Sequence, residues 1–510
     1  MAIKDKLISN TTYLALNWAS NTLFFMLFWI ILFKVLSPAF TGKVALALQI
    51  STLLSSLSLF GLGLTTQKLI SEMKENKQTN KIQNLISFSL KATFIASLIF
   101  SAGFIIFSMQ IPNFLELDSS ALWLVVISII SMTLGTILAG VYFGFQNMKK
   151  IFLTTLYGDV SLVLLTLLFL YLGLDYLSAI LAFALSHIVM FLTRIKMNML
   201  KTSKKDHIDK GMILKYSVPA FVVVFFSVVL NNSQYIILSS LQTIEITGIY
   251  AVGTKIISVL AVIPTIFGNA LFPITSGLSA DKNSKSKQSY LISLVFRYTI
   301  FIVFPLALFM IVFSKYLILF FSSPEYLVAA TFLPFLVGGA VAFGLATQFL
   351  SSLYAIGKPK KYRDSYIIST LIYLFSAIIL AYYFSASGLA ISYLLSSTVL
   401  LIITFLSIRK YLIIKLPTKT LAKVMIGIIV SFLFLFFMKP LIHNLWVAGG
   451  FVVIASIIYF TVLLKIGFYV EEDLKALEFI VERTPLFKKQ ITYFKNYLSK
   501  FVTRSHIEEL

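Results

Sequence analysis

The stretch SSALWLVVISIISMTLGTILAGVYF, residues 119–143, contains no charged residue and is long enough to cross a lipid bilayer. A helix needs about 20 apolar residues to cross about 30 Å of hydrocarbon, whereas a barrel strand needs only about 9–11. Backbone groups in lipid must pair within their own segment, so the stretch is predicted to be helical. With 59% hydrophobic residues and a mean hydropathy of +0.93, the chain cannot be a soluble multidomain protein.

Similar runs recur along the whole chain and predict an all-α, polytopic membrane protein with about fourteen transmembrane helices. The runs are 13–36, 44–65, 85–109, 119–143, 151–173, 177–197, 214–238, 247–272, 289–313, 328–352, 364–386, 388–408, 420–440 and 446–468.

The basic residues lie almost entirely in alternate gaps between these runs. Cytoplasmic segments of membrane proteins carry excess Lys and Arg, so gaps such as 66–84, 194–215 and 409–423 are predicted to be cytoplasmic. The outer gaps and loops hold few of the 42 basic residues; they are Lys34, Lys43, Lys315 and Lys439. This bias explains the net charge of +22 without nucleic acid binding. It predicts cytoplasmic termini and a multi-pass protein of the cell membrane, the plasma or inner membrane.

Two halves of the chain share short matches. The pair Thr41-Gly42 follows the first run, Thr247-Gly248 follows the seventh, and the same offset sets Gln49 opposite Lys255. Six crossings return a chain to the same side, so we predict two parallel, pseudo-symmetric six-helix lobes with an extra helix pair. The predicted divisions are 1–212 (N-terminal lobe), 213–415 (C-terminal lobe), 416–470 (helix pair) and 471–510 (cytoplasmic amphipathic tail).

Several chemistries are excluded by what the sequence lacks. The chain has no cysteine, which rules out disulfides, thiolate metal sites and a cysteine nucleophile. It has no GxxxxGK[ST] motif, so ATP hydrolysis is not expected. The first apolar run has full spanning length and no small-residue cleavage site, so we expect no cleaved signal peptide. We expect no metal and no organic cofactor.

Six stretches together resemble the polysaccharide flippases of the multidrug/oligosaccharidyl-lipid/polysaccharide exporter superfamily. They are Leu36-Ser-Pro-Ala-Phe-Thr-Gly, Leu59-Phe-Gly-Leu-Gly-Leu, Tyr216-Ser-Val-Pro-Ala, Thr247-Gly-Ile-Tyr-Ala-Val, Pro324-Glu-Tyr-Leu-Val-Ala-Ala and Ala355-Ile-Gly-Lys-Pro-Lys. The resemblance implies alternating-access transport of a polyprenyl-diphosphate-linked oligosaccharide from the inner to the outer leaflet, for cell-surface polysaccharide or glycan synthesis. The family often has an acid in the seventh helix, where this chain has Asn231-Asn232-Ser-Gln234.

Two cations inside the spans are candidate ligands of the diphosphate. Charged groups at this depth usually face a cavity or a partner. Lys255 lies about 12–14 Å from the outer end of its run, near the midplane. It either binds the diphosphate as a point charge, or it pairs with a backbone carbonyl or extends to the membrane surface. Arg297 either attracts the diphosphate from the cytoplasmic side or extends to the inner head groups.

The remaining polar groups in the spans have two interpretations. Asp159 and Lys91 lie at similar depths, which predicts a structural ion pair, with a cavity role for Lys91 as the alternative. Amides either join helices or meet sugar hydroxyls in a cavity, since they both donate and accept hydrogen bonds. The amides proposed for a cavity are Asn17, Asn21, Gln49, Asn232 and Gln234.

Two other functions compete with flipping. A cation-coupled multidrug exporter of the same superfamily needs an intramembrane carboxylate, and Asp159 is the one available. A membrane glycan polymerase or ligase needs a positioned acid or base, and the short outer loops have few acids to offer. We therefore expect a transporter rather than an enzyme. Its expected partners are the lipid-linked oligosaccharide, membrane lipids, and glycosyltransferases or a polymerase of the glycan pathway, and we expect a monomer.

Overall fold

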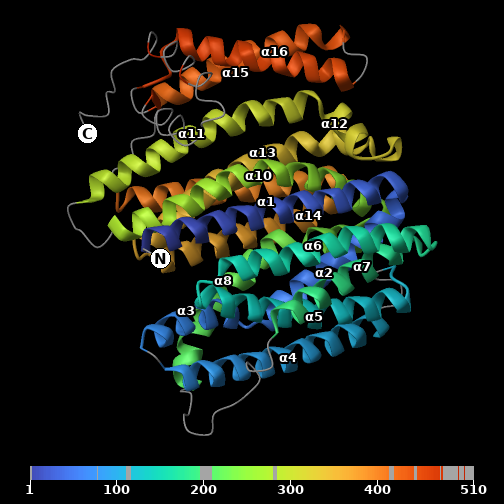
Figure 1. Cartoon of the computed structure of the whole chain (residues 1–510). Helices are drawn as coiled ribbons and strands as arrows, with labels where there is room; N and C mark the ends of the chain where they lie inside the picture. The colour runs from blue at the N-terminus through green and yellow to red at the C-terminus, as the bar shows by residue number, and fades with distance from the viewer. Residues whose placement is uncertain are drawn as a thin grey trace. The chain divides into compact units, whose positions relative to one another are not determined.

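The protein is described here from a computed structural model, shown in Figure 1. The described residues are 3–76, 78–110, 116–195, 210–278, 284–412, 418–441, 445–470, and the single positions 473, 474, 492 and 499. Within these residues the regular structure is helical and contains no strand, which confirms the predicted all-α class. The predicted amphipathic tail, 471–510, lies almost wholly outside the described residues.

The helices follow one another with short connections. The first half contains α1 (Ile3–Val35), α2 (Pro38–Ser58), α3 (Leu62–Glu75), α4 (Thr79–Gln110), α5 (Ser119–Gly144), α6 (Met148–Tyr171), α7 (Asp175–Arg194), α8 (Lys210–Asn232) and α9 (Gln234–Leu241). The second contains α10 (Ile244–Leu278), α11 (Lys285–Val312), α12 (Ser314–Phe321), the 3-10 turn η3 (Pro324–Tyr326), α13 (Ala329–Ala355), α14 (Pro359–Arg409), α15 (Thr418–Met438), η4 (Lys439–Leu441) and α16 (Leu445–Lys465).

Thirteen helices of the described chain are long and apolar enough to cross a membrane, against about fourteen runs in the sequence. The difference lies in α14, which contains both the run 364–386 and the run 388–408. Its 51 residues would extend about 76 Å as a straight helix, more than twice the thickness of the hydrocarbon. The protein is therefore a multi-pass membrane protein, and the number of crossings depends on the geometry of α14.

The helix α14 bends back at Ser385, which has φ 54° and ψ −136°. A Cβ atom at Gly388 would collide with the carbonyl oxygen of Leu380, although these residues would be about 12 Å apart in a straight helix. The bend leaves backbone carbonyls without helical partners, and the Gln242 amide donates to the carbonyl of Ala381 at 3.0 Å. One continuous element thus contains two predicted crossings.

Two predicted runs are broken by local backbone geometry. The run 44–65 ends as a helix at Ser58, because Phe60 (φ 47°) and Gly61 (φ 71°) adopt left-handed conformations before α3. A side chain at Gly61 would collide with the backbone of α8. The run 214–238 is likewise divided at Ser233 into α8 and α9.

Contacts divide the chain into two compact units. The first comprises residues 1–259, 321–336 and 363–396, and the second comprises 260–320, 337–362 and 397–510. Because α10, α13 and α14 contribute to both units, this division follows contacts rather than the order of the helices. The lobes 1–212 and 213–415 remain a prediction.

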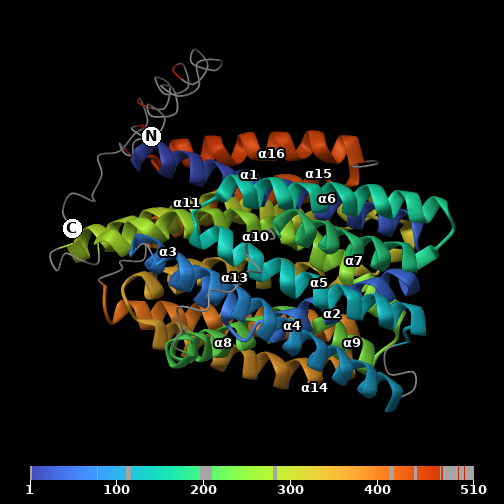
Figure 2. The ribbon, with the colours of Figure 1, turned by 60° about the horizontal axis from the view of Figure 1, so that its bottom comes forward.

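In the first unit, α1 packs along α6, and α5, α6 and α7 pack on one another, as Figures 1 and 2 show. The α4 helix packs on α3 and α5 instead. In the second unit, α15 and α16 pack as a pair with α11 beside them. Buried Phe296, Phe349 and Tyr459 belong to its core.

Within the first unit, the N-terminal ends of α2 and α10 cross at a reciprocal backbone contact. A Cβ at Gly42 would lie 3.1 Å from the backbone nitrogen of Gly248, and one at Gly248 would lie 2.8 Å from that of Gly42. Gly42 also touches the carbonyl of Ile244, and Gly248 touches that of Pro38. Pro38 and Ile244 are separated in sequence by the same number of residues as Gly42 and Gly248, the separation of the two Thr-Gly pairs. The two halves of the contact are therefore equivalent, and the contact has a local two-fold symmetry.

We predict that Gly248→Ala lowers stability by about 1–3 kcal/mol or more, because the new methyl group meets backbone that cannot turn aside. The matched control is Gly103→Ala in α4, where an added Cβ has nothing within 4 Å and helix propensity favours alanine. Thermal unfolding of both variants in detergent checks this, and equal midpoints would contradict the proposed close contact.

Candidate functional site

Four side chains of α1 form a ridge along one flank of the helix. Asn17, Asn21, Phe25 and Trp29 follow one another at intervals of four residues, which brings each next to the one before it. From Asn17 to Trp29 the ridge extends about 18 Å. Its two ends contact different helices, α6 and α10, and differ in chemistry.

Lys255 of α10 lies at the aromatic end of this ridge. Its Nζ is 4.7 Å from the centroid of the Trp29 ring, 5.4 Å from that of Phe25 and 5.6 Å from that of Tyr235. Among the described residues it contacts no carboxylate and no hydrogen-bond acceptor. A cation–π contact contributes about 0.5–2 kcal/mol but brings no negative charge. The half-buried ammonium is therefore solvated by rings and left without a counter-ion.

Two buried donors near Lys255 also lack partners. The Trp29 indole N–H, on a side chain only 1% exposed, finds no acceptor in the described part of the chain. The Tyr250 hydroxyl is unpaired as well, and its ring packs edge-on against Tyr235. Buried polar groups are usually hydrogen-bonded, so an unpaired N–H beside an uncompensated cation suits an anionic acceptor.

At the other end of the ridge, the Asn21 amide donates to Oδ1 of Asp159 on α6 at 3.0 Å. The structure does not contain the predicted Asp159–Lys91 ion pair. Asp159 is buried between α6 and α1, whereas Lys91 is exposed on α4, which packs on α3 and α5. Equal depth along two helices therefore did not make these residues neighbours.

The cation that interacts electrostatically with Asp159 is Arg194, at the end of α7, in place of the predicted Lys91. Its guanidinium is buried and donates to the hydroxyls of Thr154 and Thr155 and to the carbonyl of Gly135, at 2.8–3.1 Å. Asp159 lies one turn from Thr155 on the same side of α6. Arg194 falls within the basic segment 194–215 that was predicted to be cytoplasmic, because an arginine that closes an apolar run looks the same in sequence whether it is buried or exposed.

The other proposed cavity amides lie around the break between α8 and α9. Gln49 of α2 is buried and its amide donates to the backbone carbonyl of Asn231 at 3.3 Å. Asn232 and Gln234 flank the break and are half-buried. The structure thus brings Gln49 close to this segment through Asn231. Roles for Gln49, Asn232 and Gln234 in binding sugar remain predictions.

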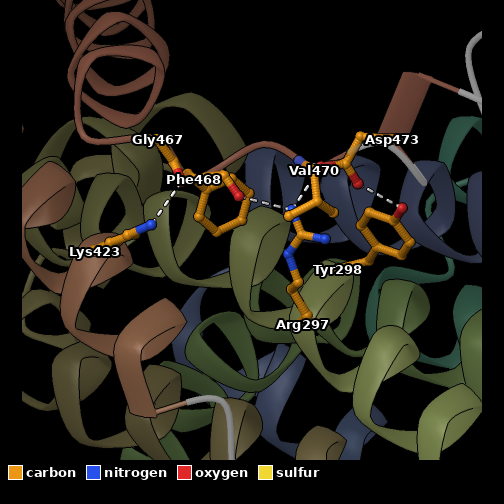
Figure 3. Close-up of polar contacts among 7 residues, drawn as sticks. All are labelled: Arg297, Tyr298, Lys423, Gly467, Phe468, Val470 and Asp473. Carbon is orange, nitrogen blue, oxygen red and sulfur yellow. Dashed lines mark hydrogen bonds and ion pairs between the residues drawn. The ribbon is translucent and has the colours of Figure 1, made fainter. Parts of the chain in front are cut away.

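Arg297 lies in the second unit and is held by the segment after α16, as Figure 3 shows. Its Nη2 contacts Oδ2 of Asp473 at 2.6 Å and donates to the carbonyl of Phe468 at 2.9 Å. The Tyr298 hydroxyl donates to the same carboxylate at 2.7 Å, and Lys423 donates to the Gly467 carbonyl at 2.6 Å. The charge of Arg297 is therefore balanced within the protein, and its role toward a diphosphate remains a prediction.

The segment after α16 is also fixed by burial of its aromatic residues. Phe468 stacks on Phe301 of α11 with ring centroids 5.2 Å apart. Burial, reinforced by the Asp473 carboxylate, raises the pKa of the neighbouring Tyr469 hydroxyl, so this side chain stays neutral. The sequence did not identify Asp473 because it follows the last predicted span.

We predict that Asp473→Asn lowers stability by about 3–5 kcal/mol, because it leaves the buried Arg297 guanidinium without a counter-ion. Replacing both partners, as Arg297→Met with Asp473→Leu, should recover most of the loss, since an apolar pair needs no compensation. Asp364→Asn is the control; its exposed pair with Arg363 contributes about 0–1 kcal/mol. Thermal unfolding compares them, and similar losses for Asp473→Asn and Asp364→Asn would contradict the prediction.

Comparisons with known proteins agree with the motifs. The family of polysaccharide biosynthesis proteins matches residues 7–279. The lipid II flippase MurJ, in an inward closed conformation, is 17% identical with a TM-score of 0.70, covering 89% of this chain and 98% of that one. No curated protein sequence matches the chain.

Two MATE transporters also share the fold. An inward-facing MATE family transporter of the MOP superfamily is 16% identical with a TM-score of 0.61, covering 76% of this chain and 94% of that one. The Vibrio cholerae MATE transporter VcmN is 16% identical with a TM-score of 0.53, covering 79% and 98%. At these identities the likeness concerns the fold, which is that of membrane transporters. With more than half of its length matched by the family, the chain belongs to the polysaccharide biosynthesis proteins, as its motifs predicted.

Proposed function

We propose that this protein moves a polyprenyl-diphosphate-linked oligosaccharide from the cytoplasmic to the outer leaflet of the plasma membrane by alternating access. The proposal joins three facts: membership of the polysaccharide biosynthesis family, the fold of membrane transporters, and an uncompensated cation within a span. The transported lipid would supply a surface polysaccharide pathway, with glycosyltransferases and a polymerase as the partners that make and use it.

The observation that carries the proposal is the environment of Lys255. A diphosphate brings the negative charge that the ammonium lacks and the acceptors that the Trp29 N–H lacks. The aromatic rings keep the ammonium in place without neutralising it, so the site is ready for an anion. A cation would instead meet repulsion there.

The crossing of α2 and α10 suits movement between two states. The α2 and α10 helices meet at Gly42 and Gly248, where only small residues separate the backbones, so the contact can part without unpacking large side chains. We propose that this crossing closes the outer side when the cavity faces the cytoplasm, with both termini cytoplasmic.

A second candidate function is export of a cationic drug coupled to an ion. The fold similarity to MATE transporters and the intramembrane carboxylate of Asp159 favour it. The unbalanced charge of Lys255 argues against a cationic cargo, and the charge of Arg194 reduces the attraction of Asp159 for a cation.

We predict that Lys255→Met slows flipping about tenfold or more in proteoliposomes, because it removes a charged ligand of the diphosphate worth about 1.5–3 kcal/mol. A labelled polyprenyl-diphosphate oligosaccharide is loaded into the membrane, and its exposure to an external sugar-modifying enzyme is followed. Lys439→Met is the matched control, because Lys439 is exposed and outside the site.

Equal rates for the wild type and Lys255→Met would remove Lys255 from the mechanism. Transport of a cationic dye, with no movement of any lipid-linked glycan, would replace flipping by the second candidate function.

A further inference from the structure

We infer that Asp159 and Asn17 form a subsite that accepts hydrogen bonds from the hydroxyl groups of the sugar, and that α1 thereby orients the ligand. This inference rests on the proposed function and adds the sugar side of the site. Its basis is two unpaired oxygens at one end of the α1 ridge.

Each of these oxygens is buried and lacks a donor. Oδ2 of Asp159 and Oδ1 of Asn17 have no hydrogen-bond partner in the described part of the chain. The Asp159 side chain is 3% exposed, and its other oxygen accepts from Asn21. Buried carboxylate and amide oxygens rarely remain unpaired, so the position suits a group that donates hydrogen bonds.

The charges around this position favour a neutral donor over a cation. The nearby Arg194 guanidinium contacts only the uncharged oxygens of Thr154, Thr155 and Gly135, so its charge acts on Asp159 without a direct ion pair. Together the two charges nearly cancel. A bound cation would leave the cluster positive inside the membrane, whereas a sugar hydroxyl adds no charge.

The residue that contacts Asp159 is itself exposed, so we infer that a ligand reaches the two oxygens past Asn21. This amide is exposed on α1, and an exposed amide at membrane depth suits a water-filled space better than lipid. A hydroxyl that displaces the Asn21 amide can donate to Asp159 and accept from Asn21. In this inference the Asn21 amide donates to Asp159 in the empty site and to the sugar hydroxyl in the filled one.

The two ends of the ridge are opposite in hydrogen-bonding character. The unpaired groups at Asn17 and Asp159 are acceptors, and those at Trp29 and Lys255 are donors. Asn21 and Trp29 are about 12 Å apart along α1, a distance that an oligosaccharide can bridge. The ligand therefore lies with its phosphates toward Trp29 and its sugars toward Asn17.

The test measures the binding of two probes to the purified full-length protein in detergent. The probes are farnesyl diphosphate and farnesyl diphosphate carrying a disaccharide, with several disaccharides compared. We expect the wild type to bind at least one disaccharide-bearing probe about tenfold more tightly than the bare probe, since hydrogen bonds to a charged carboxylate are strong. Asp159→Leu should abolish this difference and leave the affinity for farnesyl diphosphate within about twofold.

Further variants keep the test decisive if Asp159→Leu fails to fold. Asn17→Leu leaves the Asp159 carboxylate in place and should reduce the affinity difference between the disaccharide-bearing probe and the bare probe about threefold. Lys255→Met should weaken the binding of both probes by the same factor. Asp364→Asn, at an exposed acid, should leave the affinity for both probes unchanged.

The possible failures are distinguishable. If farnesyl diphosphate binds through Lys255 but no disaccharide improves binding, the sugar subsite is wrong and the proposed function stands. If neither probe binds, both are wrong. If variants at Asp159 and Asn17 change thermal stability but not the preference between probes, the oxygens hold only an ordered water. If Na⁺ raises the unfolding temperature of the wild type but not of Asp159→Asn, the site takes a cation and the inference is overturned.

Discussion

The arrangement of charged side chains in this protein follows from the cost of burying charge in hydrocarbon. A charged group at membrane depth needs a partner supplied by the chain or by a ligand. Arg297 has the carboxylate of Asp473, and Asp159 has the amide of Asn21 with Arg194 nearby. In the described part of the chain, Lys255 contacts only aromatic rings. Among these buried charges it is therefore the one for which we propose a ligand as the partner.

Features that depend on one segment at a time could be predicted from the sequence. Length and apolarity predicted the helical class and the segments long enough to cross a membrane. The basic gaps predicted the orientation of these segments, which stays a prediction. Two adjacent runs were also predicted within α14, although no proline marks the bend at Ser385. The break at Gly61 could not be located from the sequence, because it depends on the close approach of α8. The break at Ser233 falls in the polar stretch Asn231-Asn232-Ser233-Gln234, which had been included in a single span.

The partners of buried charges could not be predicted, because depth along a helix says nothing about which helix lies opposite. Lys91 and Asp159 share a depth but lie on helices with different neighbours. Arg194 and Asp473 lie at the edges of predicted spans, where a charge is expected to be solvated. Asn21 donates to Asp159, the buried acid of α6, which is the contact between helices expected of an amide in a span, and its role in a cavity stays a prediction.

The predicted internal repeat allows Lys255 to be compared with the residue at the matching position of the first half, Gln49. The offset that relates Gly42 to Gly248 also relates Gln49 to Lys255, so the predicted repeat sets these two positions opposite each other. Gln49 is neutral and its amide is satisfied by the Asn231 carbonyl, whereas Lys255 is charged and unsatisfied. A cavity with two-fold symmetry would bind both ends of a ligand alike. A single unbalanced charge on one side instead suits the proposed ligand, whose diphosphate lies on one side of its sugar.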